Sequence, residues 1–284
     1  MATLVSFHAH PDDEAIATGG TLAKASADGQ RVVLVVATRG ERGEVPEGFL
    51  TAGEQLADRR VVETHVAAKA LGIDRVEFLG YTDSGMMGEP TNQDPDSFWQ
   101  ASIDDAAERL AAILRAEDAD VLTIYDDHGT YGHPDHIQVH RVGRRAAHLA
   151  GTARVYEATM NRDHLQRLIR TADDSAMDLP DLPDADSFDG FGTSEDQITA
   201  AIDVSDYLGA KRAAMAAHAS QIGDTSLFLA LPPEAFAATW GLEWFVRPSW
   251  PTRPLRSSLF DDDSCWASVP GAWQPSPALL ESEG

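Results

Sequence analysis

The sequence predicts an α/β protein with a Rossmann-like, mostly parallel sheet, helices on both faces, and a C-terminal part packed on it. Strand-like and helix-like segments alternate over the first 150 residues, which is typical of a parallel sheet built from strand–helix–strand units. The strand-like segments are continuously apolar rather than alternating, so we expect them to be buried on both faces. The chain has 284 residues, 43% of them hydrophobic, which is enough for one sizeable core.

Four short segments rich in Val, Leu and Ile are expected to form the parallel strands. Residues of this kind favour strands, and the segment 31–37 contains the strongest run of them. Each segment is short enough for a strand and is followed by a polar or glycine-containing stretch. The four expected strands are residues 3–8, 31–37, 75–79 and 120–125.

Helices are expected after each of these strands. Gly29 and Gly72 follow the first two and are typical residues at a helix C-terminus. The third carries Ile103, Leu110 and Leu114 on one stripe, which indicates an amphipathic helix. The four expected helices are residues 15–28, 52–71, 102–117 and about 134–150.

The sequence after about residue 155 is less regular. Residues 171–197 contain nine Asp or Glu and no Lys or Arg, so we expect a long acidic loop. Residues 206–219 predict a helix, and the apolar and aromatic residues of 227–245 are expected to return to the core. We therefore expect a single domain over residues 1–246, with its chemical motifs within 1–150, and a Pro-, Ser- and Asp-rich tail over 247–284.

Charge and cysteine content narrow the function. A formal net charge of -24 excludes nucleic acid and anionic membranes as expected partners, because both are polyanions. Cys265 is the single cysteine, so a metal must be bound by histidines and carboxylates. The chain has no apolar run near the roughly 18 residues of a transmembrane helix and no expected signal peptide. We expect a cytoplasmic protein, and its oligomeric state stays open.

The first motif lies where the first strand ends and contains His8, His10, Asp12, Asp13 and Glu14. Burying such groups is costly unless they are paired or bind a metal. His10 and Asp13 place an imidazole and a carboxylate across one turn, and zinc binds both. Of two adjacent carboxylates, one can bind the metal while the other acts as a base. An acidic helix N-terminus would also explain the acids, but not the histidine at the strand end.

The second motif follows the fourth strand and contains Tyr131, His133, Pro134, Asp135 and His136. Pro134 and Asp135 suit a helix start, and the two histidines are three residues apart, so both can face one side of its first turn. Two histidines that merely cap a loop are the alternative interpretation. Because both motifs follow strands of one parallel sheet, we expect them to meet at one site, suited to catalytic zinc or non-haem iron.

Together, the two motifs resemble those of the PIG-L/LmbE family of zinc N-deacetylases. The resemblance runs from about residue 3 to 150, with weaker support to about 222. Within this family the chain is most similar to the actinobacterial mycothiol branch. The resemblance implies that His10, Asp13 and His136 bind the metal, which is expected to be Zn²⁺ with Fe²⁺ as the alternative.

The resemblance also implies catalytic roles. It makes Asp12 the general base that activates the attacking water, and His133 the residue that stabilises the tetrahedral oxyanion. Asp135 is implied to orient His133, and Tyr131 to assist the same step.

Substrate-binding positions follow from the resemblance as well. They are Arg60, Asp83 and His218. The sequence departs from the mycothiol enzymes in having Gly129-Thr130 where they usually have two glycines before the motif tyrosine. Its acidic segment 171–197 is also unusual.

The expected function is hydrolysis of the N-acetyl or N-acyl group of an aminosugar conjugate such as N-acetylglucosaminyl-inositol. An amidase of mycothiol S-conjugates, or a deacetylase of another glucosamine-containing metabolite, is the alternative. A non-catalytic nucleotide-binding module would carry a Gly-x-Gly-x-x-Gly turn after the first strand, where this chain has the acidic motif instead. A non-hydrolytic metal-binding sensor is the remaining possibility.

Overall fold

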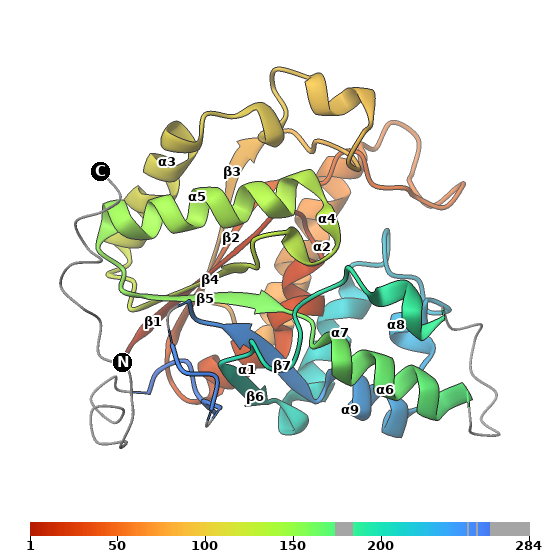
Figure 1. Cartoon of the computed structure of the whole chain (residues 1–284). Helices are drawn as coiled ribbons and strands as arrows, with labels where there is room; N and C mark the ends of the chain where they lie inside the picture. The colour runs from red at the N-terminus through yellow and green to blue at the C-terminus, as the bar shows by residue number, and fades with distance from the viewer. Residues whose placement is uncertain (174–183, 249, 254, 262–284) are drawn as a thin grey trace.

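Seven strands form one sheet in the computed structural model, which describes residues 1–173, 184–248, 250–253 and 255–261 (Figure 1). Across the sheet the strand order is β3-β2-β1-β4-β5-β7-β6. The first five strands are parallel, whereas β7 is antiparallel to both β5 and β6. The strands are β1 (Thr3–His8), β2 (Arg31–Thr38), β3 (Arg75–Tyr81), β4 (Val121–Tyr125), β5 (Arg154–Thr159), β6 (Ala200–Asp203) and β7 (Leu242–Val246).

The sheet confirms the predicted fold class and extends it. All four predicted strands are present, and β1 has the predicted bounds. From β1 the chain adds β2 and β3 on one side, then returns to place β4 on the other side. The strand order therefore reverses between β1 and β4, and ligands of open α/β sheets bind at the carboxyl ends of strands at such a point.

Two layers of helices cover the sheet. One layer contains α3 (Ile103–Ala116) and α5 (Pro134–Ala150), which pack on each other. The other contains α1 (Gly19–Ala27), α2 (Leu56–Leu71) and α7 (Leu208–Ala217), as Figure 1 shows. The remaining α-helices are α4 (Gly129–Gly132), α6 (Arg162–Asp173), α8 (Leu227–Ala230) and α9 (Pro233–Trp240), and a π-helical segment, η1 (Glu14–Thr18), precedes α1.

The core lies on both faces of the sheet because successive side chains of a strand point to opposite faces. Val5 and Phe7 of β1 pack in the cluster that includes α3 and α5. Leu4, their neighbour in sequence, packs in the cluster that includes α1, α2 and α7. All three are fully buried, which confirms the interpretation of the uninterrupted apolar strands.

Several predicted boundaries were wrong. The helix expected from residue 52 begins at Leu56, because Glu54 instead accepts hydrogen bonds from the backbone and hydroxyl of Thr51 in a preceding turn. The acidic segment is not a loop throughout, since α6 extends to Asp173 and a 3-10 helix covers Ala185–Phe188. Residues 174–183, the middle of that segment, lie outside the described residues.

The described part of the predicted C-terminal tail contacts the sheet. Ala200 of β6 pairs with Arg256, and the side chains of Arg256 and Leu259 are buried. Residues 262–284, including Cys265, lie outside the described residues. None of the helices in the described ranges is long and apolar enough to span a membrane.

Glu157 of β5 is a buried carboxylate whose ionisation is unfavourable. Its side chain lies 3.2 Å from the guanidinium of Arg144 and 3.6 Å from Nδ1 of His140. Burial raises the pKa of Glu157 from 4.5 to about 7, although Arg144 acts in the opposite direction. The folded protein therefore retains a proton that the unfolded chain releases, so the stability contributed by this group falls as the pH rises between about 4.5 and 7.

We expect Glu157→Gln to remove this pH dependence. The amide stays neutral and still accepts a hydrogen bond from Arg144, so the variant gains up to about 3 kcal/mol over the natural protein above pH 7. Unfolding by urea at pH 5 and pH 8 measures the difference. It should be small at pH 5 and favour the variant at pH 8, whereas equal differences at both values would contradict the raised pKa.

Candidate active site

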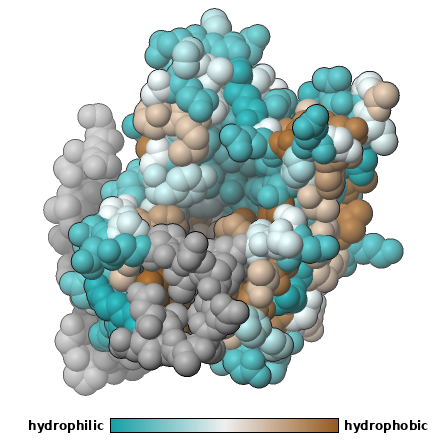
Figure 2. Space-filling view, turned by 90° about the vertical axis from the view of Figure 1, so that its right-hand side faces the viewer, coloured by the Kyte–Doolittle hydropathy of each residue, from teal (hydrophilic) through white to brown (hydrophobic). Residues whose placement is uncertain are grey.

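The two sequence motifs lie side by side because β1 and β4 are neighbours in the sheet. The first motif follows the carboxyl end of β1, and the second follows that of β4. Figure 2 views the molecule from the side on which β5 ends, and its surface is hollowed near the centre. A cavity of about 610 Å³ lies between the motifs, at the carboxyl ends of the strands, where the sequence predicted a site.

A tight turn arranges the first motif. The backbone N–H of His10 donates to Oδ2 of Asp13 over 2.8 Å, which fixes that carboxylate against the end of β1. Asp12 has φ +101°, a conformation that L-residues rarely adopt. Its carbonyl accepts hydrogen bonds from Ala15 and Ile16 at the start of η1. The two adjacent carboxylates therefore point in different directions, as a division of their roles requires.

The second motif begins in α4 and continues into α5. Thr130 of α4 has φ +65°, which glycine adopts easily and threonine does not. Thr130, which stands where the mycothiol enzymes usually have the second of two glycines, thus has a strained backbone next to Tyr131. His133 is the N-cap of α5, and its Nδ1 accepts a hydrogen bond from the backbone N–H of Asp135 over 3.1 Å. This bond leaves Nε2 of His133 as the protonated nitrogen of the neutral ring.

His10, Asp13 and His136 are brought together by these two turns. Oδ2 of Asp13 lies 3.4 Å from Nδ1 of His10 and 3.4 Å from Nε2 of His136. A tetrahedral zinc ion with bonds of about 2.1 Å places its ligand atoms roughly 3.4 Å apart. The donor types and these two distances are therefore compatible with a divalent metal ion bound by His10, Asp13 and His136.

The second nitrogen of His10 faces a different set of groups. Nε2 of His10 lies 3.1 Å from Oδ2 of Asp135 and 3.6 Å from Oδ1 of Asp83. Asp135 is fixed in turn by the backbone N–H and hydroxyl of Ser84. A carboxylate on the far nitrogen is the usual way to orient a metal-binding histidine. Asp135, expected to orient His133, is thus bonded through its side chain to His10, and only its backbone reaches His133.

Among the described residues, two sets of side chains have donor atoms that all lie within 4.8 Å of one another. One set is His10, His133 and His136, the other is His10, Asp83, His133 and Asp135, and Asp13 belongs to neither. In the second group, Asp135 is already occupied by its hydrogen bonds from Ser84 and His10. Because Nε2 of His10 is engaged with Asp135, Nδ1 is the nitrogen left to bind a metal, and we therefore favour the face of His10 that turns toward Asp13.

The environments of Asp12 and Asp13 separate their acidities. Burial raises the pKa of Asp12 to about 6, with Arg60 opposing this shift and Asp13 adding to it. Burial also acts to raise the pKa of Asp13, but His136 and His10 outweigh it and hold that pKa well below its usual range. Neighbouring carboxylates with separated pKa values are typical of a pair that divides metal binding and proton transfer.

His133 and Tyr131 are the groups placed to act on a substrate carbonyl. Burial, together with the nearby His10 and His136, lowers the pKa of His133 to about 4, so the ring is neutral at pH 7. Tyr131 is 45% exposed, and its hydroxyl lies 3.4 Å from Nε2 of His136. Burial of the hydroxyl raises the pKa of Tyr131 above its ordinary value, so it is a proton donor at neutral pH.

Two of the three expected substrate-binding residues line the cavity. Arg60 donates to the carbonyls of Gly40 and Pro11 and lies 3.3 Å from Oδ2 of Asp12. Asp83 accepts hydrogen bonds from the backbone N–H groups of Arg42 and Gly85. The side chain of Arg60 is therefore mainly committed to the protein backbone.

His218 lies elsewhere than expected. Its side chain is fully buried, is not among the residues that line the cavity, and contacts Oε1 of Glu14 over 2.6 Å. Burial opposes protonation, but Glu14 outweighs it and raises the pKa of His218. The structure thus places His218 outside the set of residues that line the cavity, in contact with Glu14.

The turn after β2 also contributes to the cavity wall, since Arg42 and Glu44 line it. Four apolar lining residues come from the less regular second half of the chain, and no local sequence pattern marked them as part of the site. They are Met160, Phe191, Phe228 and Trp240.

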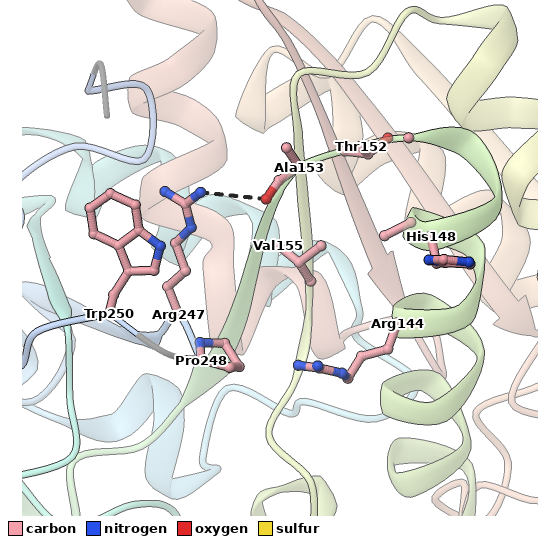
Figure 3. A pocket seen from close by; sticks show the side chains of 10 residues that line it. Arg144, His148, Thr152, Ala153, Val155, Arg247, Pro248 and Trp250 are labelled. Carbon is pink, nitrogen blue, oxygen red and sulfur yellow. Dashed lines mark hydrogen bonds between the residues drawn. The ribbon is translucent and has the colours of Figure 1, made fainter. Parts of the chain in front are cut away.

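A second cavity of about 430 Å³ lies where α5 ends and β5 begins, and therefore at the amino end of that strand (Figure 3). Arg144 and His148 of α5 line one side, and Arg247 and Trp250 line the other. The guanidinium of Arg247 lies 4.2 Å from the ring centre of Trp250 and donates to the carbonyl of Ala153. The cavity contains none of the residues predicted for the site.

The chain is similar in sequence to known proteins. The family model of PIG-L, described as GlcNAc-PI de-N-acetylase, matches residues 5–147, half of the chain. A 1D-myo-inositol 2-acetamido-2-deoxy-alpha-D-glucopyranoside deacetylase of Salinispora arenicola is 39% identical over 96% of this chain and 93% of its own length. A protein of the same description from Streptomyces griseus is 44% identical over 80% of this chain and 77% of its own.

Solved structures share the fold. An N,N'-diacetylchitobiose deacetylase from Pyrococcus horikoshii has a TM-score of 0.52 and 24% identity over 78% of this chain and 71% of its own. A teicoplanin deacetylase in its zinc-inhibited form has a TM-score of 0.58 and 18% identity over 87% of this chain and 98% of its own.

Fold and site together define a metal-dependent hydrolase on a Rossmann-like sheet. The chain belongs to the PIG-L family and is a hydrolytic N-deacetylase. The resemblance stated from the two motifs is thereby confirmed.

Proposed function

We propose that this chain is a zinc-dependent deacetylase that removes the N-acetyl group of an N-acetylglucosaminyl-inositol. The observation that carries the proposal is the single oxygen of Asp13 placed 3.4 Å from both His10 and His136, with the carboxylate of Asp12 beside it. The substrate follows from the relatives of about 40% identity that match most of the chain.

His10, Asp13 and His136 would hold the metal. When bound, zinc polarises the amide carbonyl and makes water more acidic. Asp135 and Ser84 hold His10 from its other side, so the ring is fixed before the metal arrives.

Asp12 takes a proton from the attacking water at its carboxylate. Arg60 lies 3.3 Å away and keeps the side chain in place. His133 donates its Nε2–H to the carbonyl oxygen as negative charge develops there, and Tyr131 assists from the exposed side. When the C–N bond breaks, Asp12 returns its proton to the leaving amine, so the base is regenerated.

The walls of the cavity suit an aminosugar conjugate. Arg42, Glu44, Asp83 and Gln221 present polar groups that can bind hydroxyls. The apolar lining residues from the second half of the chain favour a second candidate, an amidase that cleaves a larger acyl group from mycothiol S-conjugates, because they could bury the apolar part of such a substrate.

A direct comparison of substrates tests the proposal. Zinc-loaded protein is incubated with N-acetylglucosaminyl-inositol or with bimane-labelled mycothiol, and free amine and acetate are measured. We expect amine and acetate from the first substrate. Turnover of the mycothiol conjugate alone would favour the amidase, and turnover of neither would move the function to another aminosugar amide.

We expect His133→Ala to lower kcat about 10²- to 10³-fold, the usual cost of removing one donor to a developing oxyanion. Because its pKa is lowered to about 4, His133 acts as a neutral donor, and the loss should be constant between pH 6 and 8. Steady-state rates at several pH values measure this. A loss that is confined to pH values below about 6 would show instead that His133 acts as a cation.

A further inference from the structure

The peptide bond between Pro11 and Asp12 is held at both of its polar atoms by buried side chains. The guanidinium of Arg60 donates to the carbonyl of Pro11 over 2.5 Å. The N–H of Asp12 donates to Oε2 of Glu14 over 3.1 Å. Asp12 itself has φ +101°, and a residue persists in such a conformation only where its surroundings enforce it.

Glu14 is in turn held by a residue from the far end of the chain. Its Oε1 lies 2.6 Å from Nε2 of His218, and both side chains are fully buried. His218 is the C-cap of α7, and the turn that follows it is tied to α2 by two hydrogen bonds from Ser220 to Glu63. Since a buried carboxylate requires partners, Glu14 is confined to one position.

We propose that Glu14 and His218 are positioning residues that fix the backbone of Asp12 and thereby aim its carboxylate at the reacting atoms. Neither residue lines the cavity, so neither can act on the substrate directly. The order of contact is His218 to Glu14, and Glu14 to the N–H of Asp12. This inference rests on the proposed role of Asp12 as the base.

A neighbouring buried ion pair shows what simple anchoring looks like. Lys211 lies 2.6 Å from Glu243, which accepts the backbone N–H groups of Gly20 and Thr21 at the start of α1. That pair holds the start of a helix, and its hydrogen bonds within the described residues do not reach Asp12. The pair of Glu14 and His218 differs because its hydrogen bonds end on the catalytic turn itself.

Four variants of the full, metal-loaded chain test the proposal: His218→Ala, His218→Gln, Glu14→Ala and Ser220→Ala. We expect His218→Ala and Glu14→Ala each to lower kcat about 100-fold, because a misplacement of a catalytic group by roughly 1 Å costs about this much. KM and bound metal should stay unchanged. His218→Gln should recover part of kcat, since its amide nitrogen can reach Glu14.

Ser220→Ala is the matched control. It removes a buried hydrogen bond to Glu63 from the turn that follows His218 but leaves Glu14 untouched. We expect a lower unfolding temperature with unchanged kcat. If His218→Ala behaves in the same way, the pair is only structural and the proposal fails.

Two further measurements separate this proposal from that of the base. In an Asp12→Asn background, His218→Ala should cause no additional loss of kcat, and an additive loss would overturn the positioning role.

Amide hydrogen exchange at Asp12 should be faster in His218→Ala and in Glu14→Ala. If Asp12→Asn alone retains the natural rate, the proposed base is wrong, while the exchange rates still report whether the pair holds the turn. If an alanine variant does not fold, His218→Gln should show the same changes in kcat and exchange at a smaller amplitude, and a natural kcat together with natural exchange at Asp12 would overturn the proposal.

Discussion

Asp12→Asn should lower kcat roughly 10³-fold, within the 10²- to 10⁴-fold that a positioned general base contributes, while bound zinc stays stoichiometric. Asparagine has the shape of aspartate but cannot take a proton from water. The metal is retained because the donor atoms meet at Oδ2 of Asp13, and Asp12 points instead toward Arg60. The effect on KM should be small.

Amine release and metal content of the purified variant measure this result. Glu157→Gln is a suitable control, since it makes the same carboxylate-to-amide change at a buried residue of β5 that does not line the cavity. That control should turn over at the natural rate. A near-natural rate for Asp12→Asn would remove Asp12 as the base, and loss of zinc would make it a ligand.

The first half of the fold was predictable because its signals are local. The apolar runs of β1 to β4 and the stripe of α3 are visible within short windows, and β1 and α5 have the bounds expected from them. The edge of the sheet was missed for a physical reason. β6 has four residues, and β5 carries a buried Glu157, so neither gives a continuous apolar run.

The site was predictable in its residue types but not in its pairings. The motifs give histidines and carboxylates at two strand ends, and the parallel sheet brings them together. The bonds that orient them span large separations, such as the one between Ser84 and Asp135, 51 residues apart, and that between Glu14 and His218, 204 apart. No local pattern marks such partners, so His218 was expected at the substrate although it contacts Glu14 and is not among the residues that line the cavity.

Asp13→Ala should abolish both metal binding and turnover, which sets it apart from its neighbour Asp12. Its Oδ2 lies 3.4 Å from both His10 and His136, so its loss leaves two histidines without the carboxylate between them. The backbone N–H of His10 also loses its acceptor, which loosens the turn that follows β1.

The experiment strips zinc from the natural protein and from Asp13→Ala with a chelator and then returns Zn²⁺ or Fe²⁺. The natural protein should regain activity with zinc, and the variant with neither ion, because the carboxylate that joins the two histidines is gone. Asp12→Asn, treated in the same way, should regain the metal without the activity. Stoichiometric zinc in Asp13→Ala would instead assign the ion to His10, His133 and His136, the other set of nitrogens close enough to hold it.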